Sequence, residues 1–422
     1  MVAIITLAGL LALQFPISFA QDASAELDGG YAGRIAKPSR TTFSIVTEAT
    51  ANPVASGLSI DNGKAYIKYS TEVGYFLQDL NTTNQTGFDY TSQNFGLLNR
   101  TYPSQPPHGR PTQWQLLLSH LASLNRASRS TSYKLLFLAR HGEGFHNAAE
   151  SFFGTPAWNC YWAQADGNGT STWADAALTA NGRAQNDKAR SYFARLFAHE
   201  GLSPPGSWYV SPLRRCVQTA EGTWRGLRLP GSGSGSGSGS GRGNGNGKGK
   251  GYRPVVKELL REGMSIHTCD RRSRRAVLED EFPDVAFERT FVDQDELWSG
   301  VVAETPSAQD YRSKVLLDDV FGSDREEVLS FTSHSGEIRA LLRVVGHIPF
   351  SLGTGQILPL VVKAETVRSA PPATTTAPWA TSAWCTNGPP VTSIAGGACV
   401  CQGGVAPTAV SPDVVFTTRP AL

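Results

Sequence analysis

From Tyr133 onward the chain alternates short apolar runs with amphipathic helical patterns, and this alternation limits the possible folds more than any other feature. The run "YKLLFLA", which begins at Tyr133, is apolar on both faces, as in a strand covered by helices on both sides. A helix is expected over 179–201, with Phe193 and Leu196 on its apolar stripe and Gly201 at its end. The pattern predicts an α/β three-layer sandwich with a mostly parallel central sheet.

The composition changes along the chain and suggests how it is organised. Residues 21–132 are mixed and rich in Thr, Ser, Asn and Gly, and we expect them to form an extension packed on a main domain at 133–365. A Gly/Ser-rich insertion at 231–251 has almost no side chains to bury, which favours a flexible surface loop. Residues 366–422 are rich in Pro, Ala and Thr and contain cysteines, which predicts a disordered tail.

Residues 1–20 have the composition of a secretory signal peptide. The apolar run from Val2 to Leu13 is too short to span a bilayer, and Ser18 and Ala20 are small residues of the kind that signal peptidase requires, although no Lys or Arg precedes the run. The even count of six cysteines suits an oxidising compartment. Glycosylation sequons are present at Asn81, Asn84, Asn99 and Asn168. We therefore expect a secreted glycoprotein with disulfides and no membrane association after signal cleavage.

The charge balance argues against some partners. The formal net charge is only +2, so the sequence gives no reason to expect nucleic-acid binding. The sequence does not define an oligomeric state.

Charged side chains follow four predicted strands at the points where the strands end. Arg140 and His141 follow the first strand, and Arg215 lies in "SPLRRCVQTA" after the second. Glu262 lies in "LLREGM" after the third strand, and His334 lies in "SHSGE" after the fourth. Ligands of open α/β sheets bind beyond the carboxyl ends of the strands. The sequence therefore predicts a basic pocket that contains a single acid.

These side chains suit the transfer of a phosphoryl group. Guanidinium groups match phosphate oxygens bidentately. A neutral histidine can attack phosphorus through one ring nitrogen when the other donates to a backbone carbonyl. A second histidine can stabilise the charge on the equatorial oxygens, and a protonated carboxyl can donate its proton to the leaving alkoxide.

Other residues leave alternatives open. Glu258 is a second candidate for the acid, or it faces solvent. His146 could bind a metal with His141 and Glu143, but the two histidines are five residues apart and not the four that one helical face requires. We therefore expect neither a metal nor a cofactor. We expect Cys160, Cys216 and Cys269 to serve packing or to form disulfides, and not to act as catalytic nucleophiles.

Four motifs in this order resemble those of the histidine phosphatase superfamily, over roughly Tyr75 to Glu365. "LARHGEGFHN" is similar to the Arg-His-Gly signature, and "ALTANGRAQ" is similar to a Leu-Thr-x-x-Gly-x-x-Gln helix start. "SPLRRCVQTA" resembles the Ser-x-Leu-x-Arg segment, and "TSHSGEIRALL" resembles the segment with the second catalytic histidine. "GTPAWNCYWAQADG" and "HTCDRRS" resemble a fungal secreted subgroup of the phosphoglycerate-mutase-like branch.

The resemblance implies roles for individual residues. His141 would carry the phosphoryl group as a phosphohistidine, and Glu262 would be the acid, because the mutase-like branch takes its acid from a Glu after the third strand. The other site residues that it implies are Arg140, Asn147, Arg215 and His334. The chain departs from the mutases at Gly144, where they often carry a hydroxyl residue.

We expect a phosphomonoester hydrolase that acts on a small phosphorylated substrate. One alternative is a phosphoryl transferase of the phosphoglycerate mutase type, and another is an inactive relative that binds phosphate. A secreted location argues against a glycolytic mutase, and the intact set of site residues argues against an inactive relative. Leaving-group contacts come from variable loops, so the substrate itself is not predicted.

Overall fold

The computed structural model of the chain describes residues 65–103, 109–230, 251–392 and 398–409. The predicted signal peptide and all but the last residue of the Gly/Ser-rich insertion lie outside these ranges. Among the residues that the structure describes, no helix combines the length and hydrophobicity needed to cross a bilayer.

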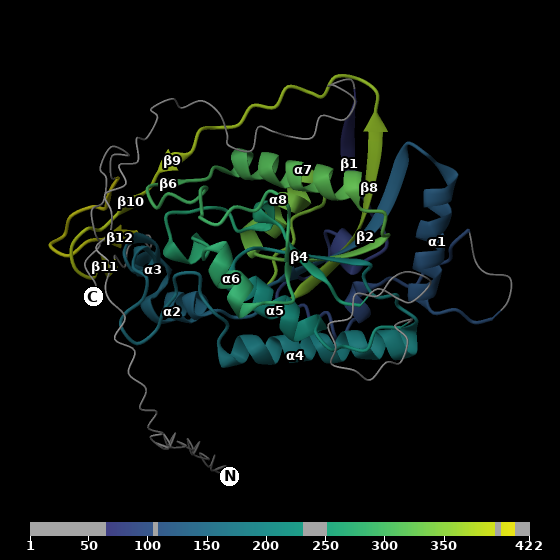
Figure 1. The fold of residues 1–422 in the computed structure, drawn as a ribbon, viewed down its shortest axis with the longest axis horizontal. Helices are drawn as coiled ribbons and strands as arrows, with labels where there is room; N and C mark the ends of the chain where they lie inside the picture. The colour runs from purple at the N-terminus through teal and green to yellow at the C-terminus, as the bar shows by residue number, and fades with distance from the viewer. Residues whose placement is uncertain (1–64, 104–108, 231–250, 393–397, 410–422) are drawn as a thin grey trace, which may run out of the picture. The chain divides into compact units, whose positions relative to one another are not determined.

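A seven-stranded sheet forms the centre of the described structure (Figure 1). Its strands are Tyr66–Glu72 (β1), Thr131–Arg140 (β2), Ser207–Val210 (β3), Pro254–Val256 (β4), Ala286–Phe287 (β5), Val328–Ser333 (β7) and Ile357–Val367 (β8). They follow the order β1-β8-β2-β7-β3-β4-β5. The pairs β2/β7, β7/β3, β3/β4 and β4/β5 are parallel, whereas β8 runs antiparallel to both β1 and β2. The predicted α/β class with a mostly parallel sheet is therefore confirmed.

Strand β2 is buried from Lys134 to Ala139, as expected for a strand covered on both faces. Its one charged residue in this run, Lys134, is satisfied by the backbone. The ammonium group donates to the carbonyls of Asp324 at 3.0 Å and Glu326 at 2.6 Å. These bonds offset the cost of burying the charge, so the run can remain in the core.

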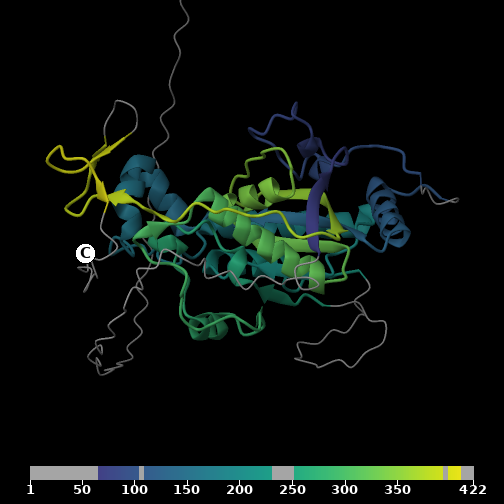
Figure 2. The same cartoon turned by 90° about the horizontal axis from the view of Figure 1, so that it is seen from above.

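Helices cover both faces of the sheet. Helix α4 (Ala180–Arg195) packs on α5 (Arg214–Trp224), and α7 (Pro306–Ser323) packs on α8 (Ser335–Val344). Figure 1 shows these two pairs on opposite sides of the sheet. Helix α1 (Gln113–Ala127) lies against β2 in both views (Figures 1 and 2). The remaining α-helices of the described residues are α2 (Phe145–Phe153), α3 (Thr155–Cys160) and α6 (Arg275–Glu281).

The helix expected over 179–201 is present, with a changed last turn. The Thr179 hydroxyl accepts from the Gly182 amide at 3.1 Å and so caps α4. The chain continues as a π-helical turn, Leu196–Glu200, and ends at Gly201 with φ of 64°. Glycine adopts this left-handed conformation without strain, which explains why the helix stops there.

The described part of the predicted N-terminal extension contributes to the main core. Strand β1 pairs along β8 at the edge of the sheet. The buried rings of Phe95 and Phe137 lie 5.3 Å apart, and Phe95 lies at the same distance from Phe193 of α4. Because Phe137 belongs to β2, these aromatic contacts join the extension to the centre of the molecule.

The C-terminal tail differs from the expected disorder. Disulfides join Cys160 of α3 to Cys399 and Cys385 to Cys401. Three short antiparallel pairs also involve the tail. Ala380–Thr381 (β9) pairs with Val302–Ala303 (β6) of the main domain. Within the tail, Ala383–Trp384 (β10) pairs with Thr408–Ala409 (β13), and Val391–Thr392 (β11) pairs with Cys399–Val400 (β12). The prediction of disorder is wrong for these residues because disulfides and backbone pairing replace the apolar core that the tail lacks.

Candidate active site

The site is built where the central parallel strands end. Arg140 and Ser333 are partners in the register of β2 and β7, and the His141 amide donates to the Ser333 carbonyl at 2.9 Å. This pairing places His141 beside His334, and their ring centroids are 5.0 Å apart. Parallel pairing therefore brings together two histidines that are distant in the sequence.

The backbone fixes the His141 ring in one orientation. Its Nδ1 lies 2.7 Å from the Gly142 carbonyl, to which only a protonated nitrogen can donate. Its Nε2 lies 3.3 Å from Nε of Arg215, whose N–H donates to it. Burial lowers the pKa of His141 well below its usual value, and the charges of Arg215 and Arg140 act in the same direction. The ring is therefore neutral, and its Nε2 lone pair faces the basic pocket.

His334 is held by two side chains from the segment after β3. Its Nε2 lies 2.7 Å from the Ser211 hydroxyl and 3.2 Å from Sγ of Cys216. Burial lowers the pKa of His334 well below its usual value, with Arg215 as the next cause. A neutral ring beside His141 can donate a hydrogen bond to a phosphoryl oxygen.

Both phosphate-binding candidates are anchored by backbone carbonyls. Arg140 Nη1 donates to the Leu352 carbonyl at 2.7 Å, and Arg215 Nη1 donates to the Cys269 carbonyl at 2.6 Å. Arg215 is only 1% exposed, and its Nη2 lies 3.6 Å from Oδ1 of Asp270. Each guanidinium is thus fixed at one end, and Nε of Arg215 still reaches Nε2 of His141.

Glu262 lies against the first turn of α8. Its Oε1 accepts from the amides of Gly263 and Glu337, each at 2.9 Å, and its Oε2 accepts from the Gly336 amide at 3.2 Å. Burial raises the pKa of Glu262, and the negative charge of Asp270 adds to this effect. The hydrogen bonds from the Gly263 and Gly336 amides and the charge of Arg215 oppose this rise. A carboxyl whose pKa is raised holds its proton to a higher pH than an ordinary glutamate, which suits a general acid.

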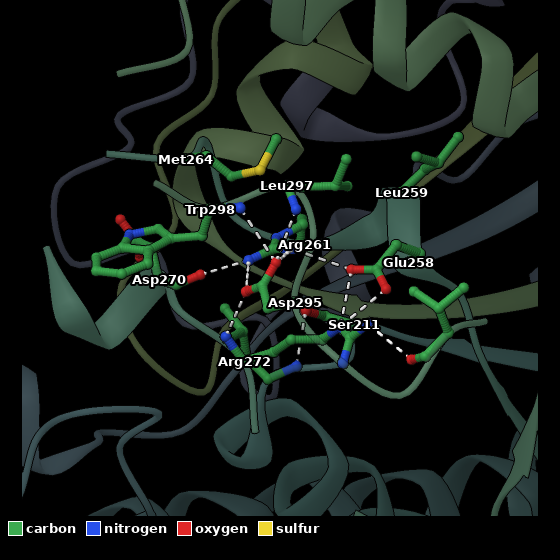
Figure 3. A network of polar contacts seen from close by, with 12 residues as sticks. Ser211, Glu258, Leu259, Arg261, Met264, Asp270, Arg272, Asp295, Leu297 and Trp298 are labelled. Carbon is green, nitrogen blue, oxygen red and sulfur yellow. Dashed lines mark hydrogen bonds and ion pairs between the residues drawn. The ribbon is translucent and has the colours of Figure 1, made fainter. Parts of the chain in front are cut away.

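The second acid candidate, Glu258, belongs to a different network. It accepts from Arg261 at 3.0 Å and from Nε of Arg272 at 2.8 Å, while Asp295 also pairs with Arg261. Figure 3 shows these four side chains grouped together. Burial raises the pKa of Glu258 as well, against the pull of both arginines. Contact geometry therefore separates the two acids, and it favours Glu262 as the proton donor.

Asn147 has a structural contact that the sequence did not predict. Its Oδ1 accepts from the Gly144 amide at 3.0 Å at the start of α2. His146, one residue earlier, lies with its ring centroid 5.3 Å from that of His141. The first turn of α2 therefore lies beside His141.

Two described clusters have the composition of a metal site, and the cysteines of the first, Cys160, Cys385 and Cys399, form disulfides. Ligand atoms of His267, Cys269 and Asp270 lie within 4.8 Å of one another. Burial raises the pKa of the Cys269 thiol well above its usual value, so the thiol stays protonated. Asp270 pairs with Arg215 and accepts from the Ser265 hydroxyl at 2.6 Å. Because the thiol is protonated and the Asp270 carboxylate is already paired, this cluster is better suited to positioning Arg215 than to binding a cation.

Three residues that shape the site were not predicted from the sequence. Ser211 contacts His334, Asp270 pairs with Arg215, and the Thr219 hydroxyl accepts from the Gly142 amide at 3.0 Å. Ser211 directly follows β3, and this position was the available signal. The roles of Asp270 and Thr219 depend on contacts between segments far apart in the chain, for which the sequence offers no local pattern.

Two histidines, two arginines and one carboxyl at the strand ends of an α/β sheet define a site suited to phosphoryl chemistry. A model of the histidine phosphatase superfamily (branch 1) matches residues 136–231. A probable phosphoglycerate mutase of Arthroderma benhamiae is 40% identical over 309 residues, covering 72% of this chain and 87% of the relative. Phosphomutase-like protein 3 of Candida albicans is 34% identical over 324 residues, covering 76% of this chain and 88% of the relative. The chain belongs to the histidine phosphatase superfamily.

Proposed function

We propose that the protein hydrolyses phosphate monoesters through a covalent phosphohistidine at His141. The observation that carries this proposal is the state of the His141 ring. Its Nδ1 donates to the Gly142 carbonyl, so Nε2 keeps a lone pair among Arg215 and the other basic residues. A neutral imidazole held in this way is a competent nucleophile.

In the first step, His141 Nε2 forms a bond to phosphorus while the ester P–O bond breaks. The leaving alkoxide takes the proton of Glu262. Arg140 and Arg215 stabilise the charge on the equatorial oxygens. Because Arg215 Nε–H occupies the His141 lone pair in the free protein, this bond gives way to the phosphate as the substrate binds.

In the second step, a water molecule attacks the phosphorus atom and the P–N bond breaks. The Glu262 carboxylate takes the proton of that water, which restores the acid for the next cycle. The products are the alcohol and inorganic phosphate, and no external proton donor is required.

Turnover of nitrophenyl phosphate by purified protein tests the proposal. His141→Ala removes the nucleophile, so turnover should fall by several orders of magnitude. The circular dichroism spectrum and the melting temperature should stay close to those of the wild type. Near-normal turnover in this variant would rule out His141 as the nucleophile.

A phosphoryl transferase is the second candidate, and the name of the 40% identical relative favours it. A mutase would return the phosphoryl group from His141 to another hydroxyl of the substrate. ³¹P NMR of a phosphoglycerate incubation distinguishes the two reactions, because hydrolysis yields inorganic phosphate and a mutase yields an isomeric ester. We expect inorganic phosphate.

We also propose that the protein is secreted. Two disulfides support an oxidising compartment. The asparagines of all four sequons are exposed, as glycosylation requires: Asn81, Asn84, Asn99 and Asn168. Recovery of the protein from the culture medium, with a mass that falls on treatment with an N-glycosidase, would support this location, and retention of an unglycosylated protein inside the cell would contradict it.

A further inference from the structure

A buried ion-pair cluster lies between α7, α8 and the residue after β6. Nε and Nη2 of Arg312 donate to the two carboxylate oxygens of Glu304, each at 2.8 Å, and Nη1 of Arg312 lies 3.1 Å from Oε2 of Glu337. The three side chains are at most 2% exposed. Apolar side chains of similar volume often stabilise a core as well as a buried ion pair, so stability alone does not account for this cluster.

Arg312 also binds the backbone that leads to the proposed acid. Its Nη1 donates to the carbonyls of Leu259 and Arg261, at 2.7 Å and 3.0 Å. Its Nη2 donates to the carbonyl of Glu262 at 3.2 Å. Residues 261–263 belong to no helix or strand, so these bonds replace the hydrogen bonds that regular structure would supply. One guanidinium therefore fixes the path of the chain up to Glu262.

The carboxyl group of Glu262 is held by the same cluster. Its Oε1 accepts from the Glu337 amide at 2.9 Å, and the Glu337 carboxyl is itself held by Arg312 and by the Ser313 hydroxyl at 2.8 Å. Burial raises the pKa of Glu337 to about 8, against the charge of Arg312. The hold on Glu262 does not depend on this proton, because it uses the Glu337 amide. Arg312 thus contacts Glu262 directly at its carbonyl, and through Glu337 at its carboxyl.

A second buried arginine makes the same kinds of contact away from the acid. Arg272 donates to the Glu258 carboxylate at 2.8 Å, and Figure 3 shows the two side chains together. Its other nitrogens donate to the carbonyls of residues 292–294 at 2.7 to 2.9 Å. None of these three residues belongs to the proposed site. Arg272 is therefore a matched control for Arg312.

We propose that Arg312 is the positioning residue of the general acid. It binds the backbone before Glu262 and seats Glu337 against the carboxyl group, so that the proton donor stays at the ester oxygen while the P–O bond breaks. The proton passes from Glu262 to the leaving oxygen, and Arg312 itself gives up no proton. This inference rests on the proposed function, because that function assigns the acid to Glu262.

The test compares Arg312→Lys with the control Arg272→Lys in the full chain. Lysine keeps a positive charge beside Glu304, but its single nitrogen cannot bind three carbonyls and two carboxylates together. We would measure kcat and KM on glycerol 2-phosphate, whose leaving alkoxide needs a proton, and on nitrophenyl phosphate, whose leaving group does not. Each variant is also made with Glu262→Gln, and its melting temperature is recorded.

We expect Arg312→Lys to lower kcat about 10- to 100-fold on glycerol 2-phosphate and less than about threefold on nitrophenyl phosphate. Both KM values should stay within about twofold, because the phosphate contacts are unchanged. When Glu262→Gln is present, Arg312→Lys should no longer change the ratio of the two kcat values, since the acid that it positions is gone. Arg272→Lys should lower the melting temperature and leave the ratio unchanged.

A second variant covers the case in which Arg312→Lys does not fold. The triple variant Arg312→Met, Glu304→Gln, Glu337→Gln leaves no unpaired buried charge, and we expect the same difference between the two esters. Equal losses on both esters, or a difference that persists when Glu262→Gln is present, would overturn the inference and leave the proposed function standing. Equal losses on both esters in Glu262→Gln alone would instead contradict the acid of the proposed function.

Discussion

At the scale of single residues, the same environment shifts the pKa values of His141 and Glu262 in opposite directions. Burial disfavours the charged form of each group, so it lowers the pKa of His141 and raises the pKa of Glu262. The arginines reinforce the effect on the histidine and oppose it on the carboxyl. Both shifts are in the direction that the proposed cleavage of an alkyl phosphate requires, a neutral nucleophile and a proton-donating acid.

Replacing the acid should separate substrates by their leaving groups. An alkoxide needs a proton, whereas nitrophenolate leaves without one, so Glu262→Gln should lower alkyl-ester hydrolysis by about 10²–10⁴-fold and affect nitrophenyl phosphate far less. The measurement is kcat/KM on both esters. Glu258→Gln is the control, and it should lower stability without changing the ratio of the two rates. Equal losses on both esters in Glu262→Gln would show that it is not the acid.

The raised pKa of Glu262 also sets the direction of the pH dependence. The acid acts only while it is protonated, so kcat/KM on an alkyl ester should fall as the pH rises through this pKa. Burial moves that fall to a higher pH than an ordinary glutamate would give. The kcat/KM on nitrophenyl phosphate should not fall in this way as the pH rises. The same fall on both esters would contradict the assignment of Glu262 as the acid.

The position of several candidate site residues at strand ends could be predicted because these residues lie where an apolar run ends. Arg140, His141 and His334 are the clearest cases, since the end of a parallel strand is where a charged side chain can leave the core. The contact of Asp270 with Arg215 could not be predicted in this way. Their approach depends on how the loop after β4 folds back over α5, which local pattern does not encode.

At the scale of elements, the strands and helices of the sheet were predictable, and the tail was not. The sheet elements carry periodic apolar residues, whereas residues 380–392 and 398–409 form two-residue strands whose side chains are mostly exposed. The tail is held in place by disulfides, which a search for periodic apolar residues does not detect. Both views place the strands of the tail beside α3 (Figures 1 and 2), where Cys160 forms its disulfide with Cys399.

The two disulfides should differ in their effect on stability. Cys160–Cys399 closes a sequence separation of 239 residues and Cys385–Cys401 closes 16. In the chain-entropy account, removing the longer closure costs about 2 kcal/mol more. The double variant Cys160→Ser, Cys399→Ser should therefore melt at a lower temperature than Cys385→Ser, Cys401→Ser in calorimetry. The reverse order would show that strain or local contacts dominate.

At the scale of the whole molecule, the site is closed in this structure. His141, Arg215 and His334 are each at most 2% exposed. The segment with α2 and α3 contributes to this cover, because His146 of α2 lies against His141. We therefore expect substrate entry to need a local movement of this segment, whose helix α3 is joined to the tail by the Cys160–Cys399 disulfide.

The charge distribution of the site predicts how whole-protein activity responds to additives. Arg140, Arg215 and His334 supply the donors that a phosphate dianion needs, so we expect a chelator to leave nitrophenyl phosphate turnover unchanged. Vanadate, which mimics the phosphoryl group in transfer, should inhibit competitively. Loss of turnover on chelation, with recovery on adding a divalent cation, would show that a metal takes part.

If His141 carries the phosphoryl group during turnover, the covalent intermediate can be trapped. Wild-type protein is mixed with an excess of nitrophenyl phosphate, quenched rapidly, digested and examined by mass spectrometry at neutral or basic pH. We expect an acid-labile phosphoryl group on the peptide that contains His141, formed before steady-state turnover and absent in His141→Ala. Full turnover without a phosphorylated peptide, or with the phosphoryl group on another residue, would rule out the phosphohistidine at His141.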